Sequence, residues 1–72
     1  MKLNNKELME IIELKERFLK MYANLPLALR NTEIICVLDG EPLTANACWI
    51  EVKNDTMTGK EILRYLDRLK II

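Results

Sequence analysis

The two cysteines, Cys36 and Cys48, are the side chains best suited to covalent or redox chemistry, and they lie twelve positions apart. A hairpin whose loop centres on Pro42 would place the thiols directly opposite each other, close enough for a disulfide or a redox pair. The alternative is that both thiols are buried and act as small hydrophobic groups. Because the neighbouring charges are acidic and the chain has no histidine, nothing nearby would activate a thiolate. We therefore expect two buried, free thiols.

Three carboxylates near the middle of the chain, Asp39, Glu41 and Glu51, suggest a site for a divalent cation. However, the closely spaced oxygen ligands of a calcium loop are absent, and Asp39-Gly40 is more typical of a turn. The cysteines stand alone rather than in CxxC pairs, which argues against zinc. The sequence therefore predicts no metal ion and no cofactor.

Lys15 lies in the middle of an apolar helical face, where a lysine is either a desolvated catalytic amine or a long stem that carries its ammonium to water or to a carboxylate of another chain. Together with Asp39, Glu41 and Tyr65 it could form an active site between subunits. The chain has no histidine and no phosphate-loop, nucleophile-elbow or zinc-protease motif, which excludes histidine-based acid–base catalysis. We predict no catalytic residue, and a small enzyme with an intersubunit site is the weakest of three hypotheses.

The chain has 72 residues, enough for one small domain over residues 1–72. Such a domain buries only about 60% of its unfolded surface, so it usually needs disulfides, a metal ion or a partner chain. Hydrophobic residues make up 50% of the chain, and nothing in the sequence supports a disulfide or a metal ion. The sequence therefore predicts a homodimer.

Basic and acidic residues are equal in number, eleven of each, but they are unevenly distributed. Residues 31–56 contain five acidic side chains and one basic one, while the segments on both sides are net basic. This pattern favours attraction between subunits over binding to nucleic acid, whose partners gather Lys and Arg on one face. The N-terminus has no long apolar run, so we expect no signal peptide, no membrane span and a cytoplasmic location.

A long N-terminal helix is the clearest predicted element, with Asn4 or Asn5 as its cap and an end at about Ala23, before Pro26. Its apolar residues occupy about half of the circumference, more than the ~100° of a typical surface helix. One short domain offers little to cover so wide a face, whereas a second copy would cover it. The face contains Leu8, Ile11, Ile12, Leu14, Phe18, Leu19, Met21 and Tyr22.

The segment 33–38 is apolar without alternation, which predicts a central strand covered on both faces. A lone strand leaves backbone groups unpaired, and pairing with the same strand of a second copy around a two-fold axis would satisfy them.

Residues 42–53 are open to two predictions. In the first, slightly favoured because the segment is rich in weak strand formers, a helix begins at Pro42. In the second, Asp39-Gly40 is the turn of a hairpin over residues 33–52 whose second strand runs through residues 48–52. The fold class is α+β in both, completed by homodimerisation. It has a long N-terminal helix, a central apolar strand and two helices, or a hairpin between an N-terminal and a C-terminal helix.

The last helix is marked by Thr58 and Glu61, which have capping-box spacing, with Thr56 or Asp55 as alternative caps. A strand followed by two helices is similar to the order in ribbon-helix-helix DNA-binding dimers, over about residues 33–70. The resemblance implies a strand that enters the major groove. However, the strand offers no Arg, Lys, Asn or Gln to read base edges, and its flanks are acidic, which repels phosphates. A DNA-binding regulator is therefore the second hypothesis.

The favoured hypothesis is a small self-associating interaction or structural module without readable catalytic chemistry. Trp49 is either an anchor at the interface, where tryptophan is enriched, or part of the core. The sequence identifies no small-molecule ligand. The predicted interface contains Leu8, Ile12, Lys15, Leu19, Ile34, Cys36, Leu38 and Trp49.

Overall fold

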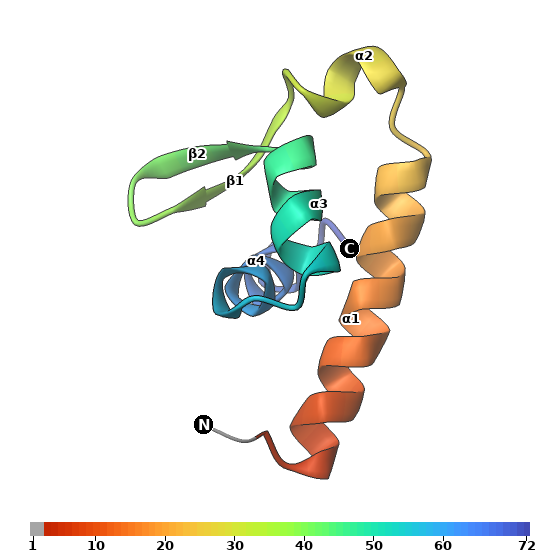
Figure 1. Ribbon diagram of the computed structural model, residues 1–72, viewed down its shortest axis with the longest axis vertical. Coiled ribbons are helices and arrows are strands. Elements are labelled where there is room, and N and C mark those ends of the chain that lie inside the picture. The colour runs from red at the N-terminus through yellow and green to blue at the C-terminus, as the bar shows by residue number, and fades with distance from the viewer. Residues whose placement is uncertain (1–2) are drawn as a thin grey trace.

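The computed structural model describes residues 3–72, which form a long helix, a β-hairpin and two further helices (Figure 1). The predicted α+β class and long N-terminal helix are confirmed, and residues 34–38 form the predicted apolar strand. That strand is neither alone nor covered on both faces, because residues 41–44 pair with it and Ile34 and Val37 are exposed. Among the described residues, no helix is both long and apolar enough to cross a membrane. The elements are α1 (Asn5–Ala23), the single turn α2 (Leu27–Arg30), β1 (Ile34–Leu38), β2 (Glu41–Thr44), α3 (Ala45–Lys53) and α4 (Met57–Arg68).

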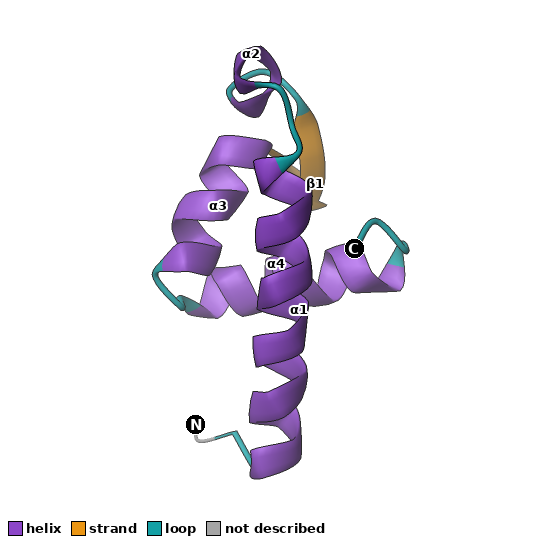
Figure 2. Cartoon of the chain, turned by 90° about the vertical axis from the view of Figure 1, so that its right-hand side faces the viewer, coloured by secondary structure: helices purple, strands orange, loops and turns teal. Residues whose placement is uncertain are grey.

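Helix α1 begins and ends where its sequence signals predict. Asn4 is the N-cap, and its side-chain Oδ1 accepts a hydrogen bond of 2.8 Å from the backbone N–H of Glu7, which satisfies one of the free donors of the first turn. The helix ends before Pro26, which cannot continue it. Its N-terminal half projects beyond α3 and α4 (Figures 1 and 2), so part of its surface has little of the chain to pack against.

The segment 42–53 combines parts of both predictions. Asp39 and Gly40 have φ angles of 50° and 79°, as the tight hairpin turn between twisted strands requires. Strand β2 follows at once and pairs antiparallel with β1. A second strand through residues 48–52 is therefore wrong, and a helix that starts at Pro42 is wrong by three residues. The reason is Thr44, whose hydroxyl accepts a hydrogen bond of 3.1 Å from the N–H of Ala47 and caps α3.

The strand register rules out the cross-strand arrangement of the two cysteines, and the predicted pair of buried, free thiols is confirmed. Cys36 lies opposite Leu43 in the hairpin, and Leu38 lies opposite Glu41. Cys48 belongs to α3, so the two thiols are not cross-strand partners. Both cysteines are free.

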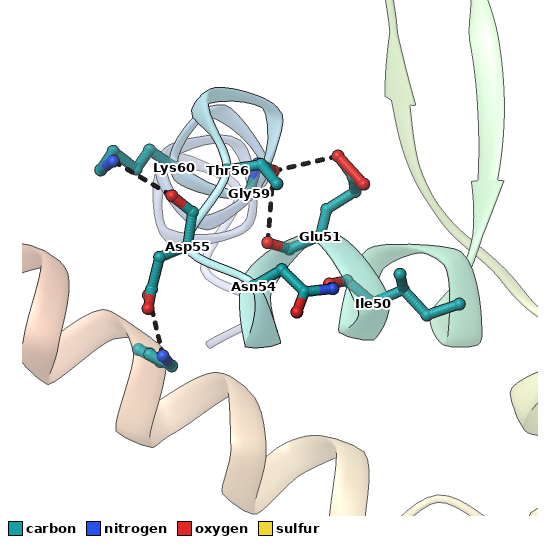
Figure 3. Close-up of polar contacts among 8 residues, drawn as sticks. Ile50, Glu51, Asn54, Asp55, Thr56, Gly59 and Lys60 are labelled. Atoms are coloured by element: carbon teal, nitrogen blue, oxygen red, sulfur yellow. Dashed lines mark hydrogen bonds and ion pairs between the residues drawn. The ribbon is translucent and has the colours of Figure 1, made fainter.

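Helix α4 is capped by Thr56, whose hydroxyl accepts a hydrogen bond of 2.9 Å from the N–H of Gly59. Thr58 lies inside the helix, so the proposed capping box from Thr58 to Glu61 is wrong and the alternative cap is correct. The Thr56 hydroxyl also contacts the backbone and side-chain oxygens of Glu51 at 3.2 and 3.0 Å (Figure 3). This residue thus ties the end of α3 to the start of α4.

Helices α3 and α4 approach so closely that one contact point leaves no room for a side chain. A Cβ atom at Gly59 would lie 2.4 Å from the carbonyl oxygen of Glu51 and 3.1 Å from the Cα of Val52. Gly59 is therefore required for packing rather than for an unusual backbone angle.

The core lies where α1, α3 and α4 meet the inner face of the hairpin. Its largest fully buried side chains come from all of these elements, so a single short chain does assemble a core of its own. The core thus joins residues that are distant in sequence. The buried residues are Ile11, Phe18, Tyr22, Cys36, Ala45, Cys48, Val52, Ile62, Leu63 and Leu66.

Candidate interaction surface

Helix α1 has two apolar stripes, and the core uses one of them. Ile11, Phe18 and Tyr22 face inward and are buried. The second stripe is formed by Leu8, Ile12, Lys15 and Leu19, which we name the outer stripe. Its three apolar members remain 46%, 50% and 37% exposed, so the described residues leave this part of the predicted interface uncovered.

The spacing of the outer stripe is that of a helix–helix seam. Its members follow one another at intervals of four, three and four residues, the a/d repeat with which two helices pack along their length. Met9, 70% exposed, extends the apolar surface beside Ile12. Both line a surface depression whose walls all belong to α1. A single helix cannot enclose a small molecule, so this surface suits a second helix.

Lys15 is partly buried in the outer stripe and is paired within its own chain. Its Nζ lies 2.8 Å from Oδ1 of Asp55 in the turn between α3 and α4 (Figure 3). The lysine stem can thus contribute apolar surface to the stripe while its charge is held to one side. The hydrogen bond and the charge of Lys15 lower the pKa of Asp55, and the charge of Lys60 acts in the same direction.

This ion pair predicts a pH-dependent effect of Asp55→Asn. Asparagine tolerates the left-handed backbone of this position, where φ is 55°, so the substitution removes the charge alone. A carboxylate with a lowered folded pKa stabilises the fold above its unfolded pKa of about 3.9. That contribution is lost as the pH falls through the folded pKa.

We expect a higher urea midpoint for the wild-type chain than for Asp55→Asn at pH 7, with a small gap because the pair is exposed. The gap should close near pH 2. In a Lys15→Met background the effect of the substitution should be much smaller, because only the charge of Lys60 still acts on Asp55. A gap of the same size at both pH values would show that the charge of Asp55 is not responsible.

Trp49 is engaged inside its own chain while remaining partly exposed. Its ring stacks on that of Tyr22 with a centroid distance of 5.5 Å and an interplanar angle of 7°, and the Nζ of Lys53 lies 4.5 Å from its centroid. Tyr22 in turn lies 4.6 Å from the Arg30 guanidinium and donates a hydrogen bond of 3.2 Å to Asn46. This aromatic stack joins α1 to α3.

Cys36 and Cys48 lie in the core, 1% and 0% exposed, and their side chains are within hydrogen-bond reach of each other. Burial raises the pKa of both thiols, and that of Cys48 to about 12. A nucleophilic or redox-active cysteine needs the opposite conditions, exposure and a lowered pKa. The arrangement is therefore that of two packing residues, and Cys36 has almost no surface left for another chain.

The carboxylates do not gather into a metal site in the part of the chain that the structure describes. Asp39 lies in the hairpin turn and Glu41 follows it; with Glu61 they border a depression beside Leu38 and Leu43. Lys15 has its partner in Asp55. Of the residues considered for an intersubunit enzyme, Asp39 and Glu41 thus border one depression, whereas Lys15 is paired with Asp55 of its own chain.

The β-hairpin places two further apolar side chains at the surface. Ile34 and Val37 on β1 are 47% and 45% exposed, whereas Leu38 is partly buried. The observed order of two strands and then two helices differs from the strand–helix–helix order that the ribbon-helix-helix resemblance rests on. Sequence reasoning did not identify Val37 as an exposed residue or Asp55 as the partner of Lys15. For Val37 the available signal was its place just before the Asp39-Gly40 turn, opposite Pro42.

No family model matches the chain, and comparison with curated proteins and with solved structures found no significant match.

Proposed function

We propose that this chain is a self-associating interaction module, in which two copies pack through the outer stripes of their α1 helices. The exposed a/d repeat of Leu8, Ile12 and Leu19 carries the proposal, because side chains with this spacing bury one another when two helices lie side by side. Lys15 can also lie in this contact between copies, because its charge is already neutralised by Asp55.

The exposed surface of the chain supports a missing partner. Its accessible area is 5170 Å², whereas a compact monomer of 8.5 kDa exposes about 4,650 Å². The excess is roughly a tenth of the total. Burial of apolar area stabilises a complex by about 25 cal/mol per Å². Association is favoured when this gain exceeds the entropy that two chains lose on binding.

The charges along α1 favour an antiparallel arrangement of the two helices. The half up to residue 13 contains three glutamates and one lysine, and the half from residue 14 contains three basic residues and one glutamate. An antiparallel pair places each acidic half against a basic half and also opposes the helix dipoles. A parallel pair would align like charges.

The test is the substitution Ile12→Glu in the outer stripe. A charge at this half-exposed position leaves the core intact but must be buried without a partner in the dimer. We expect the dissociation constant to rise at least about a hundredfold, equivalent to about 3 kcal/mol, as measured by light scattering after size-exclusion chromatography.

The matched control is Leu27→Glu, which makes the same kind of change at a residue 76% exposed on α2. It should leave self-association unchanged. Circular dichroism of both variants establishes that they remain folded. Equal association of the two variants would show that the outer stripe is not the interface.

A further inference from the structure

The two edges of the β-hairpin differ in how well they are protected. In a hairpin with a two-residue turn, the pairs Leu38–Glu41 and Cys36–Leu43 exchange backbone hydrogen bonds, and the intervening pair Val37–Pro42 does not. The backbone groups of that pair point away from the hairpin. On β2 the residue is proline, which has no N–H to offer, and the neighbouring Glu41 adds a charge. Both features are typical of an edge that must not pair.

The edge of β1 has none of this protection. Residues Ile34–Leu38 include no charge and no proline, and the N–H and C=O of Val37 face outward. The sheet formed by the described residues has two strands, so no third strand satisfies this edge. In Figure 2, β1 lies at the margin of the upper half of the molecule, on the side away from α3. The edge is therefore able to accept another strand.

The charges around β1 discriminate between two occupants, a second copy of the chain and a different peptide. If β1 paired antiparallel with itself, with Ile35 of each copy opposite Val37 of the other, Glu33 of each copy would face Asp39 of the other. Like charges directly opposite across strands are destabilising. No Lys or Arg occurs between Asn31 and Val52 to relieve the repulsion.

We propose that the free edge of β1 binds an extended segment of another protein, with alternating apolar residues flanked by Lys or Arg. The backbone of Val37 supplies hydrogen bonds, the exposed side chains of Ile34 and Val37 supply apolar contacts, and the carboxylates of Glu33, Asp39 and Glu41 attract the basic flanks. This surface is on the hairpin and is separate from the outer stripe of α1. Peptide binding to β1 is therefore tested independently of self-association through α1.

The probe is a fluorescein-labelled peptide, Lys-Lys-Val-Thr-Val-Thr-Val-Lys-Lys, compared by fluorescence anisotropy with a peptide in which every lysine is replaced by glutamate. We expect saturable binding of the basic peptide and binding of the acidic one weaker by about tenfold or more. The affinity for the basic peptide should fall between 50 and 300 mM salt, because exposed charges are screened. Equal binding of the two peptides, or no binding of the basic one at millimolar chain concentration, would overturn the proposal.

Two variants locate the site. Val37→Lys puts a like charge on the edge and should weaken binding of the basic peptide about tenfold or more, while Met57→Lys makes the same change in net charge at an exposed position of α4 and should not. Equal weakening by both variants would indicate attraction to the overall charge rather than to β1.

Two further measurements are the amide exchange of Val37 in the wild-type chain and the oligomeric state of Val37→Lys. If Val37→Lys folds poorly, the amide proton of Val37 in the wild-type chain gives the answer, because it should gain protection from exchange when peptide is added. An unprotected Val37 amide in the bound state would refute strand addition. Loss of the dimer in Val37→Lys without peptide would refute it too, by showing that a second copy occupies the edge.

Discussion

Replacing Gly59 with alanine is expected to destabilise the fold by about 3 kcal/mol, the upper range for overpacking a well-packed site. In an ordinary helix interior the same substitution stabilises by about 1 kcal/mol. The sign reverses here because the new methyl group would lie 2.4 Å from the carbonyl oxygen of Glu51, a backbone atom that cannot rotate away. Relief of the clash requires α3 and α4 to separate, which would also stretch the contacts of Thr56 with Glu51.

Urea unfolding of Gly59→Ala measures this effect, and Thr58→Ala is its matched control. Thr58 is the preceding residue of α4 and is exposed, so alanine there should be neutral or stabilising by a few tenths of a kcal/mol. A Gly59→Ala chain as stable as the wild type would contradict the close approach of the two helices.

The second large effect expected is a slow reaction of the native thiols. At pH 8 the folded chain should react with Ellman's reagent at least about 1,000-fold more slowly than the urea-unfolded chain. Cys36 and Cys48 are buried, so reaction must pass through opening of the fold, which is disfavoured by about 5 kcal/mol or more in a typical domain. Rapid labelling of either thiol under native conditions would contradict the described core.

The raised thiol pKa values also predict loss of stability at alkaline pH. In the unfolded chain the thiols ionise near pH 8.5, whereas burial keeps Cys48 protonated until about pH 12 in the folded chain. The folded state binds more protons between these values, so the free energy of unfolding should fall as the pH rises from about 9. In a Cys48→Ala variant this decline should be smaller.

The fold was predictable where the local signals agree. Asn4, the apolar period of α1 and Pro26 together define the first helix, and all three signals agree. Residues 42–53 were harder because two signals compete within a few positions. Asp39-Gly40 demands a hairpin, while the alanines that follow favour a helix. The chain satisfies both by ending β2 at Thr44, which caps α3 with its own hydroxyl.

The candidate interface was only partly predictable because helical period does not say which half of a wide apolar face the chain itself covers. That division depends on where α3 and α4 cross α1, and on contacts between distant residues such as Lys15 with Asp55 and Tyr22 with Trp49. Cys36 faces inward because of the hairpin register, which a single sequence does not fix. The close approach at Gly59 likewise depends on two helices meeting in space.

Self-association through α1 is tested most directly by sedimentation equilibrium of the wild-type chain between about 1 and 300 µM. We expect a reversible concentration-dependent shift from one chain of 8.5 kDa to twice that mass. A single-chain mass across the whole range would contradict it.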